Sequence, residues 1–487
     1  MYTIPESEIF ESMKVVNPWW ETNSIDKKLK EKTPRKYLES FYKEIIYKKL
    51  RRTALLLGPR RVGKTVLMYH AIEELMQKGV SPKKILYISI DNPVFINIRL
   101  EKLVTIFTNN FQHKLSDGLY IFFDEIQYLK GWEQHLKSLY DSYLNFQFVA
   151  SGSAASVLQK KSSQSVGRFA DFILPPMTFA EFLVFKYKGK EEEFKKLQKN
   201  YLKKMEINVR IEKVESKNNG IKDKKNIKEL NKLFLEYINY GGFPDVMFLS
   251  NKQRLEKRSR ISNDIIEKVL SGDLPSLYNV DPREVNRFFK MIAYNAGKEF
   301  SLDRLAKESG LSKPVISKYI EYLESAFLIK KISKIDQNLK KFKRETQFKL
   351  YLLNPSMRTF LFGELKEDDC DLAGLLVENA IFAQMIYNED VSNRMYYARW
   401  NSGEVDLIVL NELSQQPEYI CEIKWSDAPD LKSLKTFIKD SGYYKKITNN
   451  YESFPVVSTK TNVGVDFYEH LRFIPSAILC LMKSLEC

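Results

Sequence analysis

Gly58-Pro-Arg-Arg-Val-Gly-Lys64-Thr65 is a complete G-x-x-x-x-G-K-[ST] sequence, and its neighbours have the patterns that such a loop requires. Residues 53–57 before it are a short apolar run, which predicts a buried strand, and residues 66–75 after it carry apolar side chains at helical spacing. A strand, a glycine loop and a helix N-terminus together direct backbone N–H groups and the helix dipole at an anion. The stretch therefore predicts a phosphate-binding loop rather than an ordinary glycine turn.

The residues of this loop have distinct expected roles. Lys64 brings a mobile positive charge to the phosphates, and the Thr65 hydroxyl is a ligand for Mg²⁺. The predicted nucleotide-binding residues are Gly58, Pro59, Arg60, Arg61, Val62, Gly63, Lys64 and Thr65, together with Asp124 from a later strand.

Asp124 and Glu125 form an acidic pair at the end of an apolar run, Tyr120-Ile-Phe-Phe. A strand end beside the phosphate loop is where an acid holds the Mg²⁺ shell, so we assign Asp124 to the metal together with Thr65. Glu125 points the other way out of the strand and is positioned to polarise a water for in-line attack. We therefore expect Glu125 to be the general base.

Two further side chains are candidates for catalysis. The next apolar strand leads into Ser151-Gly-Ser153, and one of these hydroxyls, assigned to Ser153, is expected to sense the terminal phosphate or the attacking water. Arg168 follows a glycine in a loop of small residues. We expect it to stabilise charge on the phosphoryl oxygens, within its own chain or across a subunit boundary. The alternative is an ordinary surface arginine.

Composition excludes several classes of protein. The chain has 487 residues, of which 44% are hydrophobic, which is enough for several folded domains. No apolar run approaches the about 18 residues that span a bilayer, and residues 1–8 lack the features of a signal peptide. Four cysteines without a C-x-x-C pair, and only four histidines, argue against a zinc site and fit a reducing compartment. We therefore expect a cytoplasmic protein with no membrane partner.

The net charge of +15 favours a polyanionic partner such as DNA. The alternative is a lysine-loaded surface of the kind that AT-rich genomes encode, and the Lys, Asn and Ile content fits that explanation too. Charge alone does not decide between them.

Residues 300–323 have the spacing of a helix-turn-helix. Ser301 is positioned to cap a first helix, Gly310 supplies the turn, and Ser312 is positioned to cap a second helix. Lys318 remains on the outer face of that second helix, where a recognition helix meets DNA.

Two apolar runs that follow, 327–332 and 348–353, predict the strands of a wing. The segment between them, 338–344, is rich in basic and aromatic side chains and forms the expected wing tip. A winged helix serves either for DNA binding or for packing, and the basic tip favours DNA.

A second acidic constellation lies in the C-terminal third. Glu378 is on a predicted helix, Asp406 begins a strand, and Glu422-Ile-Lys424 lies on the next strand. Because residues two apart in a strand share a face, Glu422 and Lys424 should project beside Asp406. Such a set binds Mg²⁺ through oxygen ligands and activates water against a phosphodiester. We expect a metal site made by Glu378, Asp406 and Glu422 with Lys424 beside them. The alternative is a nuclease fold kept for packing or DNA binding, whose acids form salt bridges.

Alternation of short apolar strands with helical stretches predicts an α/β fold, with a P-loop NTPase parallel sheet that has helices on both faces. A helical and winged-helix region and an α/β nuclease-like region should follow. The expected parts are a helical lead-in (1–50), the nucleotide-binding core (51–185), a charged lysine-rich insertion (186–232), a helical lid (233–298), a winged helix (299–353) and a restriction-endonuclease-like domain (354–487).

Taken in order, these motifs resemble the prokaryotic AAA-type ATPases that end in the domain of unknown function 4143. The resemblance extends over roughly residues 35–430 and includes Tyr240-Gly-Gly-Phe-Pro-Asp245, Glu378-Asn379 and Gly403-Glu-Val-Asp406. It implies ATP binding and hydrolysis with Mg²⁺, a helical lid, a winged helix and a nuclease-like tail.

Three functions fit these features. The first is an ATP-driven enzyme that acts on DNA. The second is a nucleotide-state switch whose C-terminal parts bind a protein partner, a second copy of the chain or each other. The third is a DNA-binding ATPase that does not cleave.

Overall fold

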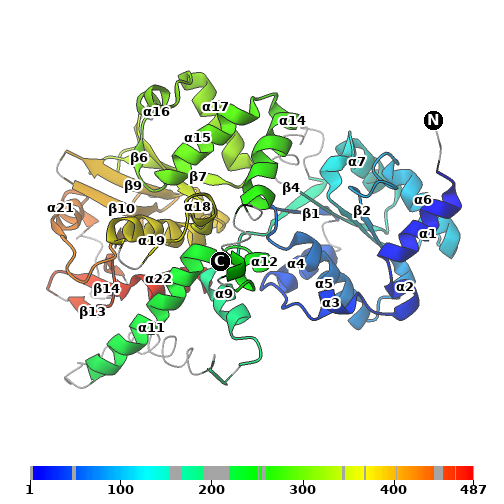
Figure 1. The fold of residues 1–487 in the computed structure, drawn as a ribbon, viewed down its shortest axis with the longest axis horizontal. Coiled ribbons are helices and arrows are strands. Elements are labelled where there is room, and N and C mark those ends of the chain that lie inside the picture. Colours follow the sequence, from blue (N-terminus) through cyan, green and yellow to red (C-terminus); the bar gives the residue numbers. More distant parts are fainter. Residues whose placement is uncertain are drawn as a thin grey trace. The chain divides into compact units, whose positions relative to one another are not determined.

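The computed structural model describes residues 4–46, 51–153, 167–190, 192–193, 195, 219–250, 252–254, 259, 262–342, 346–366, 369–401, 403–443, 453–466 and 468–485. The chain forms two compact units, residues 1–175 with 276–278, and residues 176–275 with 279–487. Each unit is built on one β-sheet with helices packed against it (Figure 1).

The sheet of the first unit is parallel and has the strand order β2-β3-β4-β1-β5. Its strands are β1 (Thr53–Gly58), β2 (Ile85–Ser89), β3 (Tyr120–Asp124), β4 (Gln147–Ser153) and β5 (Phe169–Ile173). β4 lies between β1 and β3, with Gly58 opposite Ser153. The carboxyl ends of these three strands therefore meet at one edge, and the predicted P-loop sheet is confirmed.

Helices cover this sheet, and the N-terminal ones are tied to it by buried side chains. They are α1 (Glu6–Val16), α2 (Trp19–Thr22), α3 (Lys27–Lys30), α4 (Leu38–Ile46), α5 (Lys64–Gln77), α6 (Leu100–Phe111) and α7 (Trp132–Ser142). The indoles of Trp19 and Trp20 both donate to the Ile85 carbonyl, at 3.2 and 2.8 Å. The lead-in helices are thus part of the nucleotide-binding unit rather than a separate segment.

The second unit contains a nine-stranded sheet of order β13-β14-β12-β11-β10-β9-β7-β8-β6. Its strands are β6 (Glu299–Phe300), β7 (Ile329–Ile335), β8 (Phe348–Leu352), β9 (Met395–Trp400), β10 (Gly403–Leu410), β11 (Pro417–Ile423), β12 (Val456–Thr459), β13 (Gly464–Asp466) and β14 (Leu471–Pro475). β7 pairs with β9 in parallel, so the wing strands and the C-terminal strands form one sheet. The expected boundary at residue 353 therefore does not separate two bodies.

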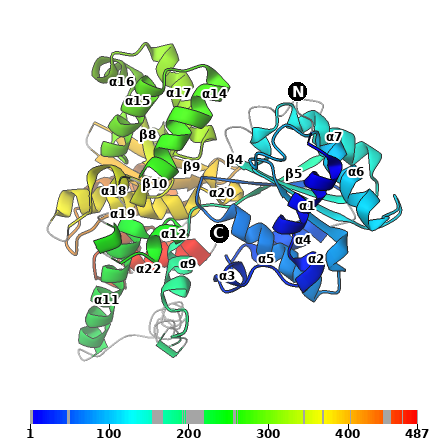
Figure 2. The same cartoon turned by 45° about the vertical axis from the view of Figure 1, so that its right-hand side comes forward.

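The helices of this unit pack on both faces of the sheet. They are α9 (Phe179–Lys186), α11 (Asn219–Tyr240), α12 (Pro244–Met247), the π-helical η4 (Asn263–Glu267) and η5 (Val269–Asp273), α15 (Pro282–Tyr294), α16 (Leu302–Ser309), α17 (Lys313–Ser325), α18 (Ser356–Phe362), α19 (Cys370–Met385), α20 (Glu389–Ser392), α21 (Lys432–Asp440) and α22 (Ser476–Leu485), while α14 (Leu274–Tyr278) is divided between the two units. α19 and α22 contribute to the core on one face and α21 to the core on the other (Figures 1 and 2). In the described part of the chain, no helix is long and apolar enough to cross a membrane.

Two helices and two antiparallel strands lie where the winged helix is expected. Ser301 caps α16 by accepting from the Arg304 N–H at 3.1 Å, Gly310 ends the helix at φ +76°, and β7 and β8 are antiparallel. Ser312 stands at the N-cap of α17, but its side chain makes no capping hydrogen bond, contrary to expectation. Of the wing tip, residues 343–345 lie outside the described part.

Two expected boundaries shift. α9 falls in the range expected for the nucleotide-binding core, but it belongs to the second unit, where the Phe179 N–H donates to the Gln384 side chain at 3.0 Å and the Ala180 N–H donates to Ser484 at 3.1 Å. The insertion expected at 186–232 lies mostly outside the described residues, and α11 already begins at Asn219.

Gly58 generates the first prediction, because a side chain has no room there. Its φ is +154°, and a Cβ would lie 2.3 Å from the Leu174 carbonyl oxygen. We expect Gly58→Ala to lower the stability of the first unit by about 2 kcal/mol or more and to weaken nucleotide binding, since backbone must move. Gly79→Ala is the control, because Gly79 has φ +90° and no atom within 4 Å of a Cβ, so it loses only about 1–2 kcal/mol. Thermal unfolding measures both, and equal losses would contradict the steric argument.

Candidate functional site

A buried carboxylate, Asp124, connects the elements around the P-loop. It is 1% exposed at the end of β3. Its Oδ2 accepts from the Thr65 hydroxyl at 2.7 Å and the Tyr87 hydroxyl at 2.8 Å. Its Oδ1 accepts from the Ser151 hydroxyl and from the Glu125 N–H, the latter at 3.1 Å. The two predicted Mg²⁺ ligands, Thr65 and Asp124, are thus in direct contact.

Tyr87, on β2, is a residue of this site that the sequence does not identify. Burial and the neighbouring Asp124 carboxylate hold the pKa of Tyr87 well above its ordinary value, so the phenol stays protonated and donates. Only the register of β2 beside β3, which pairs Ser89 with Asp124, brings this tyrosine to the site.

Lys64 lies folded over the P-loop at the start of α5. Its ammonium donates to the Gly58 and Pro59 carbonyls, both at 3.0 Å. These are neutral acceptors, which the flexible side chain is able to exchange for a phosphate oxygen. An ammonium, a hydroxyl and a carboxylate in this arrangement fit a nucleotide with Mg²⁺.

Arg35, from the N-terminal lead-in, is hydrogen-bonded to the P-loop. Its guanidinium donates to the Val62 carbonyl at 2.6 Å and to the Pro175 carbonyl at 3.0 Å, and the side chain is buried. The basic pair at residues 35–36 is visible in the sequence, but nothing there indicates a bond to the loop. Arg35 therefore ties the P-loop to the segment that follows β5.

Glu125 follows Asp124 in a left-handed backbone conformation, with φ 53° and ψ 44°. Such a conformation is uncommon for a residue with a side chain and is concentrated at functional sites. The Gln127 side chain donates to one carboxylate oxygen of Glu125. Burial raises the pKa of Glu125, Lys64 opposes this and Asp124 adds to it. The group is thus a stronger base than an ordinary glutamate.

The two other catalytic candidates have different outcomes. Ser153 lies opposite Gly58 on β4, but its side chain is outside the described part, and Ser151 is the serine seen to contact Asp124. Arg168 precedes β5 at the amino end of β1, because Thr53 pairs with Phe169.

The position of Arg168 corrects one expectation. The P-loop follows the carboxyl end of β1, so Arg168 is a strand length away from it, and its Nε binds Asp141 at 3.2 Å. A role within its own chain is therefore excluded by distance. A role across a subunit boundary stays a prediction.

In the second unit the predicted nuclease-like residues do come together, but lysines lie between them. Lys424 contacts Asp406 at 3.2 Å and Glu422 at 2.8 Å. Lys349, on β8, contacts Glu378 at 2.9 Å and Glu404 at 2.6 Å. The result is an alternation of acids and ammonium groups rather than a cluster of acids.

The pKa directions follow from this alternation. Burial and Asp406 raise the pKa of Glu422 to about 8, which Lys424 opposes. Burial raises the pKa of Asp406, but Lys424 and Lys349 more than offset this, so its pKa is lowered. Burial lowers the pKa of Lys349, but the neighbouring Glu378, Tyr351, Asp406 and Glu404 together outweigh it and hold that pKa well above the ordinary value. The ions Asp406⁻ and Lys349⁺ therefore persist at neutral pH.

The metal site expected from Glu378, Asp406 and Glu422 is not formed. Within the described residues, no group of three or more His, Cys, Asp or Glu side chains is arranged to hold a metal ion. The physical reason is Lys349, which sequence reasoning missed because it lies on a strand assigned to the wing. The acids form salt bridges, which is the alternative interpretation of this motif.

Comparison with known protein families agrees with the geometry of the first site. Residues 50–183 match the family described as AAA domain, and residues 231–368 match Domain of unknown function (DUF8612). Residues 50–183 of the first unit therefore form an AAA-type, ATPase-like domain. The resemblance to the domain of unknown function 4143 stays a prediction.

The chain is also similar to uncharacterized proteins along most of its length. Uncharacterized protein MJ1544 of Methanocaldococcus jannaschii is 24% identical over 431 residues, which cover 85% of this chain and 84% of that protein. An uncharacterized protein of Haemophilus influenzae is 24% identical over 364 residues, covering 72% of this chain and 78% of that protein.

Among solved structures, a point variant of RuvB from Thermotoga maritima is 20% identical, with a TM-score of 0.27, and covers 61% of this chain and 87% of its own. AMPPCP-bound DnaA from Aquifex aeolicus is 19% identical, with a TM-score of 0.24, and covers 63% of this chain and 92% of its own. Similarity at this level carries no further argument.

Glu125 generates the second prediction. Glu125→Gln keeps the shape and the partner Gln127 but removes the base, so we expect ATP binding to persist and hydrolysis to slow by at least ~100-fold. Lys64→Ala is the matched comparison, because it should lose binding itself. Nucleotide titration and phosphate release measure the two steps separately. Turnover near that of the unmodified protein in Glu125→Gln would place the base elsewhere.

Proposed function

We propose that the chain is an ATP-hydrolysing AAA-type protein that acts on DNA, which it holds through the winged helix, and that its nuclease-like domain does not cleave. The observation that carries the ATPase part is the contact of Thr65 with Asp124 beside the P-loop and Glu125.

Each residue of the first site has a defined task in this proposal. Thr65 and Asp124 would hold Mg²⁺, which would supply positive charge to offset the charge that develops on the phosphates. Lys64 would exchange the loop carbonyls for the terminal phosphates. Glu125 takes the proton of the attacking water. Ser153 is proposed to contact the terminal phosphate, and Arg168 to act across a subunit boundary.

Basic side chains on the winged helix support DNA as the partner. Lys318 on α17 and Lys340 and Lys341 on the wing are exposed, and Phe342 beside them is 49% exposed. Exposed cations beside an aromatic ring suit a phosphate backbone with a base to stack.

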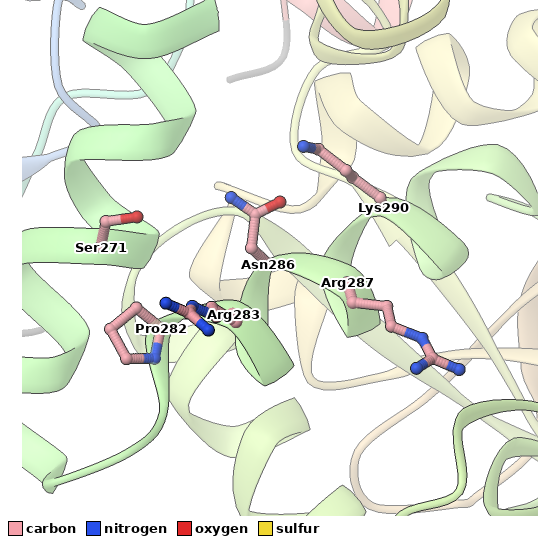
Figure 3. Close-up of a pocket in the computed structure, with 6 residues that line it drawn as sticks. All are labelled: Ser271, Pro282, Arg283, Asn286, Arg287 and Lys290. Carbon is pink, nitrogen blue, oxygen red and sulfur yellow. The ribbon is translucent and has the colours of Figure 1, made fainter.

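A basic pocket lies on α15 of the same unit. It has a volume of about 380 Å³, and its lining consists of Ser271, Pro282, Arg283, Asn286, Arg287 and Lys290. Figure 3 shows Ser271 on the neighbouring helix facing the α15 side chains. Lys290 pairs with Glu267 at 3.2 Å, whereas in the described part of the chain neither Arg283 nor Arg287 forms an ion pair. Two uncompensated guanidinium groups favour an anionic ligand such as a phosphate of the same DNA.

One observation favours a second candidate, a nucleotide-state switch that binds a protein. Tyr294 and Phe362 are 58% and 39% exposed, and their rings meet edge to face at 5.4 Å. The Arg358 guanidinium lies 5.8 and 5.5 Å from the two ring centres. Exposed aromatics with an arginine are typical of protein interfaces.

Turnover of ATP, with and without single-stranded, duplex and branched DNA, separates the two candidates. Stimulation by one of these DNAs supports the DNA proposal. Stimulation by a protein, with no response to any DNA, would instead establish the switch.

The wing generates the third prediction. We expect Lys340→Ala with Lys341→Ala to weaken DNA binding and to flatten its dependence on the logarithm of salt concentration by about 0.9 per lost phosphate contact. The control is Lys114→Ala with Lys130→Ala, which removes the same charge from exposed positions of the first unit. Fluorescence anisotropy at several salt concentrations measures both pairs. Equal slopes for the two variants would assign the winged helix to internal packing.

A further inference from the structure

The Lys349 ammonium lies where three carboxylates of the nuclease-like domain converge. Its Nζ is 2.6 Å from Glu404 Oε1, 2.9 Å from Glu378 Oε1 and 3.7 Å from Asp406 Oδ1. The side chains of Lys349, Asp406 and Glu378 are 4%, 5% and 10% exposed, whereas Glu404 is 30% exposed and also pairs with Arg399 at 3.4 Å. One cation, supplied by the chain itself, is thus coordinated by oxygens from α19 and from two positions of β10.

This arrangement has the form of a cation site that is already filled. Carboxylates collected in a buried place repel one another unless positive charge lies among them. A divalent cation binds to oxygen ligands of this kind, at about 2.0–2.6 Å from them. It would have to displace the ammonium, which would then be buried and unpaired.

Neighbouring side chains keep Lys349 in this position. It lies on β8 between Glu299 of β6 and Ile332 of β7, and its Nζ is 5.3 Å from the centre of the Tyr397 ring. Tyr351, two residues along the same face of β8, donates to Glu378 at 2.5 Å. The lysine side chain is therefore enclosed, with 4% of it exposed.

We propose that the Lys349 ammonium takes the place of a divalent cation in the nuclease-like domain, and that removing it uncovers a divalent-metal site made by Glu378, Glu404 and Asp406. The wing strand β8 thus neutralises the acids of the C-terminal domain. This goes beyond the proposed function, because it depends neither on ATP nor on DNA.

Lys349→Met tests the proposal, since methionine keeps the length of the side chain and removes its charge. Without metal, the variant should unfold at a lower temperature than the unmodified protein. With Mn²⁺ at about 100-fold above its dissociation constant, its Tm should rise by about 5–10 °C. Titration calorimetry should show Mn²⁺ bound at least ~10-fold more tightly than by the unmodified protein. Adding Asp406→Asn to Lys349→Met should abolish both effects.

Lys334→Met is the matched control. Lys334 is also poorly exposed and lies on the adjacent strand β7, where it pairs with Glu299 at 3.5 Å, but it contacts none of the three carboxylates. It should gain no metal binding. Equal Mn²⁺ affinity in Lys349→Met and Lys334→Met would overturn the proposal.

A second measurement does not depend on the folding of Lys349→Met, because it compares the unmodified protein with Asp406→Asn. The unmodified protein and Asp406→Asn share the same P-loop, so any Mn²⁺ bound there cancels in the comparison. We expect identical Mn²⁺ titrations. A site that saturates in the unmodified protein and is lost in Asp406→Asn would show that metal and Lys349 coexist, and the proposal would be wrong.

Discussion

The fold of the nucleotide-binding unit depends on satisfying one buried carboxylate. Asp124 is almost fully enclosed, and an ionised acid in such a place is tolerated only with several donors. The donors come from three different elements, namely Thr65 of α5, Tyr87 of β2 and Ser151 of β4. Each of these bonds fixes one element relative to β3. The strand order and the phosphate site are consequences of the same constraint, because β4 must lie between β1 and β3 for its serine to reach the acid.

Buried carboxylates must also be satisfied in the second unit, but there their partners are cations rather than neutral donors. There the acids are satisfied by ammonium groups from inside the chain, Lys349 and Lys424. Lys349 reaches them only because β7 and β9 join the wing to the C-terminal strands. The shared sheet therefore brings the positive charge of Lys349, on wing strand β8, to the acids of the C-terminal strands and helix α19. A C-terminal fragment without β8 would keep Lys424 against Asp406 and Arg399 against Glu404, but would lose the Lys349 ammonium that also contacts Glu378.

The sequence groups the residues of the first site, two of which are in contact in the structure, because the information for this site is local. A strand, a glycine loop and a helix are contiguous, and the acidic pair ends an apolar run, so Lys64, Thr65 and Asp124 are assigned without knowledge of the tertiary structure. The sequence does not identify Tyr87 or Arg35 as residues of this site. Tyr87 reaches it only through the register of β2 beside β3, and Arg35 only because the lead-in segment folds back onto the P-loop. The sequence likewise does not show that Lys349 contacts the acids of the C-terminal domain. Because this ammonium lies among them, the described residues do not form the expected open metal site. The loop alone assigns Arg168 to phosphate chemistry, whereas the register of β5 places it at the other end of the sheet.

Lys64 and Lys349 are both buried ammonium groups, but they differ in the acceptors that they contact. Lys64 donates to backbone carbonyls, which are neutral, and a phosphate offers a stronger, charged acceptor. Lys349 is bound to carboxylates and enclosed by paired strands, so no incoming ligand offers it a better partner. The Lys64 ammonium is thus able to exchange its carbonyl partners for a phosphate, while the Lys349 ammonium is already neutralised by carboxylates. Lys64 lies in a motif that the sequence displays and Lys349 does not, so only the structure shows which acceptors each ammonium contacts.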